Sequence, residues 1–237
     1  MEESGVDSTG LSFHEWLDRW VESLPRPHLT EAIAEPNQAA ILSVDMINGF
    51  CCEGPLASPR VAGIIPALVR LFESMNRIGV RHFILSQDTH DPEAPEFGAY
   101  PPHAVAGTSE SETISELKSL PFADTFTIIE KNSINSFIGT DLPAWLVRHP
   151  EVSTFVLVGN CTDLCVYQAA MHMRLRANAF GLPYIRVIVP ADCVQTYDMP
   201  VDVAHQVGAM PHDGDLLHRI FLYHMALNGV EVLSGLS

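Results

Sequence analysis

The sequence predicts an α/β fold: a doubly wound, mostly parallel six-stranded sheet with helices on both faces. Short apolar runs alternate with longer segments of helical periodicity from residue 38 to residue 237. Most of these runs are continuously apolar, which is typical of strands that are covered on both faces. The alternation of strands and helices further indicates a parallel sheet with helices packed on each side.

The expected elements use nearly all of residues 38–237, so we expect a single domain there. The strands are expected at residues 39–44, 82–86, 125–129, 154–158, 184–189 and 230–233. The helices between them are expected at residues 61–78, 111–120, 142–149, 163–179 and 215–228.

Residues 1–37 precede this pattern and are predicted to form an N-terminal extension. A polar tip is followed by an amphipathic stretch at residues 11–24 and a proline-rich link at residues 25–36. The amphipathic stretch carries apolar residues at helical spacing, namely Trp16, Leu17, Trp20, Val21 and Leu24. We therefore expect a short amphipathic helix that packs on the main domain or on a subunit partner.

The composition is that of a soluble globular protein. Apolar residues make up 47% of the chain, and the formal net charge is −16. Such a negative surface repels phosphate backbones and anionic lipid, so we expect no nucleic-acid or membrane partner. The chain has no apolar run of about 20 residues and no signal peptide, and its five cysteines do not suggest a disulfide framework. We expect a cytoplasmic protein with free thiols.

Reactive or charged side chains follow five successive strand runs. They are Asp45, Asp88, Lys131, Cys165 and Asp192, in chain order. The carboxyl ends of parallel strands share one edge of a sheet, and ligands bind in the crevice there. One polar residue at a strand end is usually a cap or a turn former, but five in succession predict a functional site.

Cys165 is the candidate nucleophile. Thr162 or Asp163 can cap a helix that begins here, which places Cys165 in its first turn. The free N–H groups and the helix dipole at that end favour a thiolate and can stabilise an oxyanion. The alternatives are a small buried cysteine or a disulfide to Cys161, and a reducing compartment argues against the disulfide.

Asp45 is the candidate base for this nucleophile. It directly follows an apolar strand, so its carboxylate is expected to be partly desolvated and to have a raised pKa. Lys131 follows another apolar strand and can hold the carboxylate in place and stabilise negative charge on a substrate. The alternative interpretation is a structural buried ion pair.

Asp88, His90 and His103 suit a divalent metal such as Zn²⁺. Two imidazoles and one carboxylate leave coordination positions open for water or substrate. Glu96 lies between the histidines in the sequence and is a candidate fourth ligand, directly or through water. The proline-rich segment between them is stiff and would help to hold His103 in place.

These residues resemble a known family. Asp45, Lys131 and Cys165, with the string TDLCV at 162–166, are similar to the isochorismatase-like cysteine hydrolases. The strings DTH at 88–90, YPPH at 100–103 and DMINGF at 45–50 look like the nicotinamidase branch, above all its plant-type members. The likeness covers roughly residues 38–237.

The resemblance implies an enzyme of NAD salvage, a homo-oligomer that hydrolyses nicotinamide to nicotinate and ammonia through a thioester on Cys165. It implies a catalytic triad of Asp45, Lys131 and Cys165. The N–H groups of Cys161 and Cys165 would form the oxyanion hole, with a non-proline cis peptide between Asn160 and Cys161.

The resemblance also implies how the substrate ring is held. One divalent metal, Zn²⁺ or else Fe or Mn, would bind Asp88, His90 and His103 and take the pyridine nitrogen. The aromatic residues expected to enclose the ring are Phe50, Tyr100 and Phe137.

Two alternatives to a nicotinamidase stay open. The chain could be another small-amide or isochorismatase-type hydrolase of the same superfamily, or a non-catalytic member used for binding or assembly. The intact triad argues against the non-catalytic member, and the metal trio favours the nicotinamidase.

Overall fold

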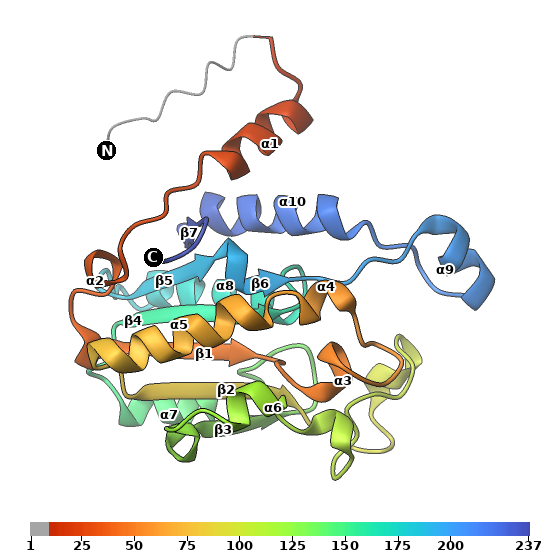
Figure 1. Cartoon of the computed structure of the whole chain (residues 1–237), viewed down its shortest axis with the longest axis horizontal. Coiled ribbons are helices and arrows are strands. Elements are labelled where there is room, and N and C mark those ends of the chain that lie inside the picture. Colours follow the sequence, from red (N-terminus) through yellow and green to blue (C-terminus); the bar gives the residue numbers. More distant parts are fainter. Residues whose placement is uncertain (1–9) are drawn as a thin grey trace.

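A parallel sheet forms the centre of the protein in a computed structural model, which describes residues 10–237 (Figure 1). Most of the polar tip lies outside the described residues. The strands are β1 (Ala39–Val44), β2 (His82–Asp88), β3 (Thr127–Lys131), β4 (Thr154–Asn160), β5 (Arg186–Pro190), β6 (Val194–Gln195) and β7 (Glu231–Leu233). The order is β3-β2-β1-β4-β5-β7, all pairs are parallel, and β6 pairs with the end of β4. This confirms the predicted fold class and adds β6, which is too short to show a periodicity.

Helices cover both faces of the sheet. They are α1 (Phe13–Glu22), α2 (Leu29–Ala32), α3 (Asn48–Cys51), α4 (Pro59–Ala62), α5 (Ile65–Ile78), α6 (Ser115–Lys118), α7 (Leu142–Arg148), α8 (Cys165–Ala179), α9 (Val201–Val207) and α10 (Gly214–Leu227). Short 3₁₀ turns include η2 (Pro95–Gly98) and η5 (Ala191–Cys193). The helix expected at 61–78 is divided into α4 and α5, and the one expected at 111–120 shrinks to α6. Helix α9 was not among the helices expected from the sequence.

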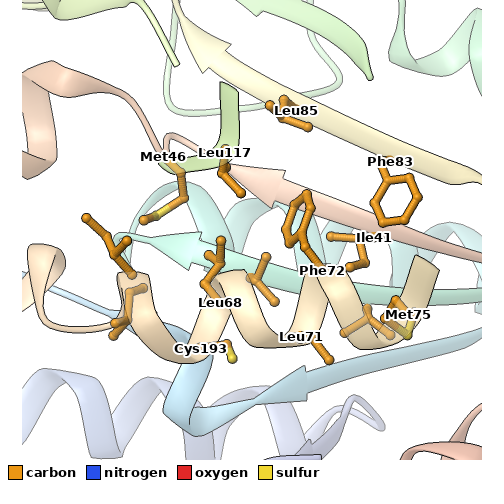
Figure 2. Packing of buried hydrophobic residues seen from close by; sticks show 14 of the residues in the cluster. Ile41, Met46, Leu68, Leu71, Phe72, Met75, Phe83, Leu85, Leu117 and Cys193 are labelled. Carbon is orange, nitrogen blue, oxygen red and sulfur yellow. The ribbon is translucent and has the colours of Figure 1, made fainter. Parts of the chain in front are cut away.

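Alternate side chains of each strand enter opposite halves of the core. Ile41 of β1 packs against Phe72 on the face that α5 covers (Figure 2). Leu42 and Val44 of the same strand enter the other half, with residues of α7, α8 and α10. Burying a side chain of the size of Phe72 contributes about 1.5–3 kcal/mol. The sheet is therefore held from both sides, which fixes the position of its carboxyl edge.

The N-terminal extension packs on the main domain through α1. A capping box between Ser12 and Glu15 starts the helix. The rings of Trp16 and Trp20 meet Tyr223 of α10 edge-on, with centroids 5.5 and 5.8 Å away. Of the two placements expected for these tryptophans, the structure shows the one on the main domain.

All five cysteines are free thiols, in agreement with the absence of a disulfide framework. In the part of the chain that the structure describes, no helix has the length and apolar character needed to cross a membrane.

Candidate active site

The candidate catalytic residues meet at the point where the order of the strands reverses. The chain runs from β1 outward to β2 and β3, then returns to place β4 on the other side of β1. Asp45 follows β1, and Cys165 begins α8 a few residues after β4. Asp88 and Lys131 are the last residues of β2 and β3. Such a switch point is where open α/β sheets bind their ligands.

Cys165 is the first residue of α8, as the sequence predicts, but the expected cap is wrong. No side chain caps α8. The Thr162 hydroxyl instead lies 2.9 Å from Nδ1 of His218, and the Asp163 carboxylate lies 2.7 Å from Nε2 of His212. These long-range partners draw both side chains away from the N-terminus of α8. The approach to the Cys165 N–H is therefore left free of a capping side chain.

The loop before Cys165 contains the non-proline cis peptide that the resemblance implies. The Asn160–Cys161 peptide is cis. Among the residues that the structure describes, no acceptor is found for the N–H of Cys161 or of Cys165. Gly159 is required just before this loop, since it has φ +109° and a Cβ there would lie 2.0 Å from the carbonyl oxygen of Val44.

Asp45 is fully buried and held on both carboxylate oxygens. Oδ1 accepts a hydrogen bond of 2.8 Å from the backbone N–H of Asp88, and Oδ2 lies 2.8 Å from Nζ of Lys131. The Asn160 side-chain amide donates to the Asp45 carbonyl oxygen. Burial and the nearby Asp88 charge raise the pKa of Asp45 to about 7, against the lowering effect of Lys131. The shift has the direction expected from its place after an apolar strand.

Lys131 carries the positive charge at the centre of this cluster. Its Nζ lies 2.8 Å from Asp45, 2.5 Å from Asp88 and 3.8 Å from the sulfur of Cys165. Burial would lower the pKa of Lys131, but the charges of Asp45 and Asp88 outweigh it and raise that pKa well above its ordinary value. The ammonium group therefore stays protonated and partly neutralises the two carboxylates.

The resting state of Cys165 differs from the sequence expectation. Burial raises the pKa of its thiol well above the ordinary value, although the charge of Lys131 lowers it. The start of a helix was expected to favour a thiolate, but desolvation is the larger effect here. Cys165 is thus a neutral thiol at rest and needs a base, and Asp45 is the carboxylate beside it. Burial also raises the pKa of Cys161 to about 12, and Cys161 is not part of the group that brings Cys165 together with Asp45 and Asp88.

Asp88, His90 and His103 form a buried cluster whose ligand atoms lie within 4.8 Å of one another. Nδ1 of His90 contacts Oδ1 of Asn132, and Nδ1 of His103 contacts the Pro101 carbonyl oxygen, both at 2.9 Å. These contacts leave both Nε2 atoms on the side of Asp88, at 3.4 and 4.0 Å from its oxygens. Nε2 of His90 is buried without a hydrogen-bond partner.

This cluster fits a divalent metal. A buried, unpaired imidazole nitrogen beside a carboxylate and a second imidazole is the donor set of a borderline metal ion. The contacts on Nδ1 are the outer-shell bonds that orient metal-binding histidines. Burial lowers the pKa of His103, which favours the neutral ring that a metal needs. Burial also acts to lower the pKa of His90, but the contact with Asp88 outweighs it and raises that pKa.

Of Glu96 and the three expected aromatic residues, Phe50 and Tyr100 lie next to the candidate metal cluster. Glu96 lies on η2, but its carboxylate is not part of the cluster that brings Asp88 and the histidines together. The rings of Phe50 and Tyr100 lie 5.6 and 6.2 Å from that of His103. Phe137 instead stacks on His172, with centroids 3.9 Å apart.

The side-chain roles of three residues near the site were not predicted from the sequence. The ring of Phe97 lies 5.4 Å from that of His90 and 5.7 Å from that of His103. Asn132 orients His90, and Asn160 holds the backbone of Asp45. Phe97 lies in the proline-rich segment between His90 and His103, and this position in the sequence could have indicated that its ring is close to both histidines. The two asparagines carry no motif.

Asp192 does not join the site, although it follows β5. It lies on η5 and forms an ion pair of 2.5 Å with Arg26 of the N-terminal link. The short turn after β5 directs this carboxylate toward the face covered by α5. Four of the five strand-end residues therefore come together, and the fifth belongs elsewhere.

Comparison with known proteins identifies the family to which the chain is similar. Residues 39–233 match the isochorismatase domain. The chain is similar to Nicotinamidase 1 of Arabidopsis thaliana, with 30% identity over 217 residues that cover 85% of this chain and 87% of that protein.

Solved structures share the fold. An isochorismatase-like hydrolase from Alkaliphilus metalliredigens is 28% identical with a TM-score of 0.65, covering 82% of this chain and 93% of that one. The pyrazinamidase of Pyrococcus horikoshii in complex with zinc is 23% identical with a TM-score of 0.65, covering 83% of this chain and 98% of that one. At that identity the second likeness concerns the fold alone.

Proposed function

The chain belongs to the isochorismatase family, and on that basis we propose that it is a nicotinamidase, which hydrolyses nicotinamide to nicotinate and ammonia. Membership of the family shows that the chain is an isochorismatase-like cysteine hydrolase. The identity of the substrate is what we propose in addition. The observation that carries this step is the contact between two groups of buried residues. Lys131 binds Asp45 of the candidate triad and Asp88 of the candidate metal cluster at once. A substrate held at the cluster would thus have its reacting group close to Cys165.

The first half-reaction begins with proton transfer from the Cys165 thiol to Asp45. The thiolate then attacks the carbonyl carbon of the amide, and the electron pair of the carbonyl moves to its oxygen. The unpaired N–H groups of Cys161 and Cys165 would donate to that oxyanion. Lys131 stabilises the negative charge and keeps the Asp45 carboxylate in place.

Collapse of this intermediate expels ammonia and leaves a thioester on Cys165. Asp45 returns its proton to the departing nitrogen, so that the carboxylate is again a base. A water molecule then loses a proton to Asp45 and attacks the thioester carbon. Cys165 leaves as a thiol by taking that proton back. The product is released as nicotinic acid, which gives its proton to ammonia or bulk water and becomes nicotinate. Each half-reaction uses the same carboxylate, whose pKa of about 7 suits both directions of transfer.

Asp88, His90 and His103 would hold a divalent metal, which we propose is Zn²⁺, as their donor set suits it. When bound, that ion supplies an open position for the pyridine nitrogen and withdraws electron density from the ring. Phe50, Tyr100 and Phe97 lie around His103 and are placed to contact an aromatic ring. Phe137, stacked on His172, is the weakest of the candidates for ring contact.

The direct test is release of ammonia from nicotinamide by the purified protein, beside pyrazinamide and a panel of aliphatic amides. We expect turnover of the two ring amides and little of the aliphatic ones. Preference for an aliphatic amide would replace this proposal by another amidase of the family. A cytoplasmic location and a homo-oligomer stay predictions.

A further inference from the structure

A cavity of about 400 Å³ lies apart from the candidate active site, beside α5 and η5. Its lining includes three arginines, Arg26, Arg70 and Arg77, together with apolar side chains such as Leu29 and Leu71. Leu71 and Cys193, which also lines the cavity, lie on the same side of α5 in Figure 2. None of the candidate catalytic or metal-binding residues lines it.

Two separate parts of the chain bring the arginines together. Arg70 and Arg77 are seven positions apart on α5, which is close to two helical turns and places them on one side. Arg26 comes from the proline-rich link. This link runs along the C-terminal residues, where the N–H of Ser234 donates to the Pro25 carbonyl oxygen at 2.9 Å and that of Ser237 donates to the Pro27 carbonyl oxygen at 3.1 Å.

Arg26 is held at the edge of the cavity by close contacts with its neighbours. Its guanidinium forms an ion pair of 2.5 Å with Asp192. A Cβ at Gly235 would lie 2.5 Å from Nη1 of Arg26 and 2.4 Å from Oδ2 of Asp192, so a larger residue there would make these two side chains move. Arg26, Arg70 and Cys193 line the cavity together.

The charged side chains that line the cavity are three arginines and one aspartate, Asp192, although the protein as a whole is acidic. The chain has a formal charge of −16 and 13 lysines and arginines in all. Within residues 10–237, Arg70 and Arg77 form no ion pair, whereas Arg26 is paired with Asp192. Guanidinium groups match the geometry of phosphate oxygens, with which they form paired hydrogen bonds.

We propose that this cavity binds a small phosphate ester, whose phosphate contacts Arg70 and Arg77 and whose organic part lies on the apolar wall. The volume is within the range of small-molecule sites. The apolar wall favours an ester over inorganic phosphate. Arg26 lies outside residues 39–233, which match the family domain, so the site depends on a part of this chain that the family match does not include. The proposal is independent of the substrate of the enzyme.

Calorimetric titration at low ionic strength tests this site, with AMP, ribose 5-phosphate and glycerol 3-phosphate as probes. Adenosine serves as the matched probe without phosphate, and inorganic phosphate as the matched probe without an organic part. We expect at least one ester to bind roughly tenfold or more tightly than its matched probes, which corresponds to about 1.4 kcal/mol. Failure of all three esters, or equal binding of inorganic phosphate, would overturn the proposal.

Paired variants locate the binding. The double variant Arg70→Gln/Arg77→Gln should weaken ester binding by roughly tenfold or more, because it removes two charge-assisted contacts. Both positions are exposed on a helix and glutamine is a good helix former, so the fold should persist, which a thermal melt would verify. Arg148→Gln, an exposed charge at the end of α7, is the control and should bind as the wild type does. Equal binding by the double variant, as expected for an ester held at the active site, would refute the location.

Discussion

The Lys131 ammonium lies 2.5 Å from an oxygen of the Asp88 carboxylate, and this contact joins the two halves of the candidate site. On one side Lys131 binds Asp45, which lies beside Cys165. On the other side Asp88 faces the two histidines of the candidate metal cluster. In the proposed function, the same buried ion pairs would set the position of the substrate ring and that of the nucleophile.

Replacing Cys165 by alanine should abolish amide hydrolysis while leaving the fold and the metal content intact. We expect a loss of roughly 10⁴-fold or more, because Cys165 is the thiol that lies beside Asp45 and Lys131. Ammonia release, circular dichroism and elemental analysis are the measurements. Activity in the alanine variant at even a tenth of the wild-type level would show that Cys165 is not the nucleophile.

Replacing Asp45 by asparagine should stop both half-reactions and change substrate binding little, because Asn cannot accept the thiol proton. The side chain keeps its shape and can still approach Lys131. Binding of nicotinamide to the variant by calorimetry, compared with its turnover, separates the two effects. Turnover close to that of the wild type would contradict the role of general base.

The rate should rise with pH through the neutral range. Asp45 has a pKa raised to about 7, and only its deprotonated form can take the proton from Cys165. Below that pKa the carboxyl is protonated and kcat/KM should fall about tenfold for each pH unit. Because Asp45, Asp88, Lys131 and Cys165 are in contact, the observed value belongs to the cluster as a whole. A kcat/KM that is flat from pH 5 to 8 would be inconsistent with this mechanism.

Replacing His103 by alanine should remove the metal and raise KM for nicotinamide strongly. Benzamide, which lacks the ring nitrogen, should be a poor substrate of the native enzyme. His205→Ala is a matched control, because His205 is exposed on α9 and belongs to none of the groups of potential metal ligands in residues 10–237. Metal-free wild-type protein that hydrolyses both amides equally well would remove the support for a metal-held pyridine ring.

Replacing Gly159 by alanine should destabilise the protein severely. The Cβ would lie 2.0 Å from the Val44 carbonyl oxygen in addition to the cost of φ +109°. Gly139→Ala separates the two effects, since Gly139 also has a positive φ but no atom within 4 Å of the added Cβ. We expect about 1–2 kcal/mol of lost unfolding free energy at Gly139 and at least about 2 kcal/mol more at Gly159. Similar losses at both positions in denaturant unfolding would exclude the steric contact.

The sequence predicted the sheet and the four-residue cluster because both follow from local patterns. A continuously apolar run such as that of β1 is recognisable, and a charged residue directly after it must lie at the carboxyl edge. That reasoning places Asp45, Asp88 and Lys131 correctly, and the helix start expected after β4 places Cys165. The same reasoning fails for Asp192.

The features that the sequence did not predict depend on distant partners. Asp163 and Thr162 do not cap α8 because His212 and His218, 49 and 56 residues further along the chain, bind them. Asp192 turns away from the site toward Arg26, which is 166 residues distant. Strand β6, with two residues, is too short to carry a period.

The central claim is that Cys165 carries the acyl group, and rapid acid quenching followed by peptide mass spectrometry tests it most directly. The wild-type enzyme, mixed with nicotinamide and quenched within the first turnovers, should yield a peptide with a nicotinoyl group on Cys165. The same peptide from the Cys165→Ala variant should carry none. Release of ammonia at the wild-type rate with the acyl group on another residue, or on none, would contradict the account.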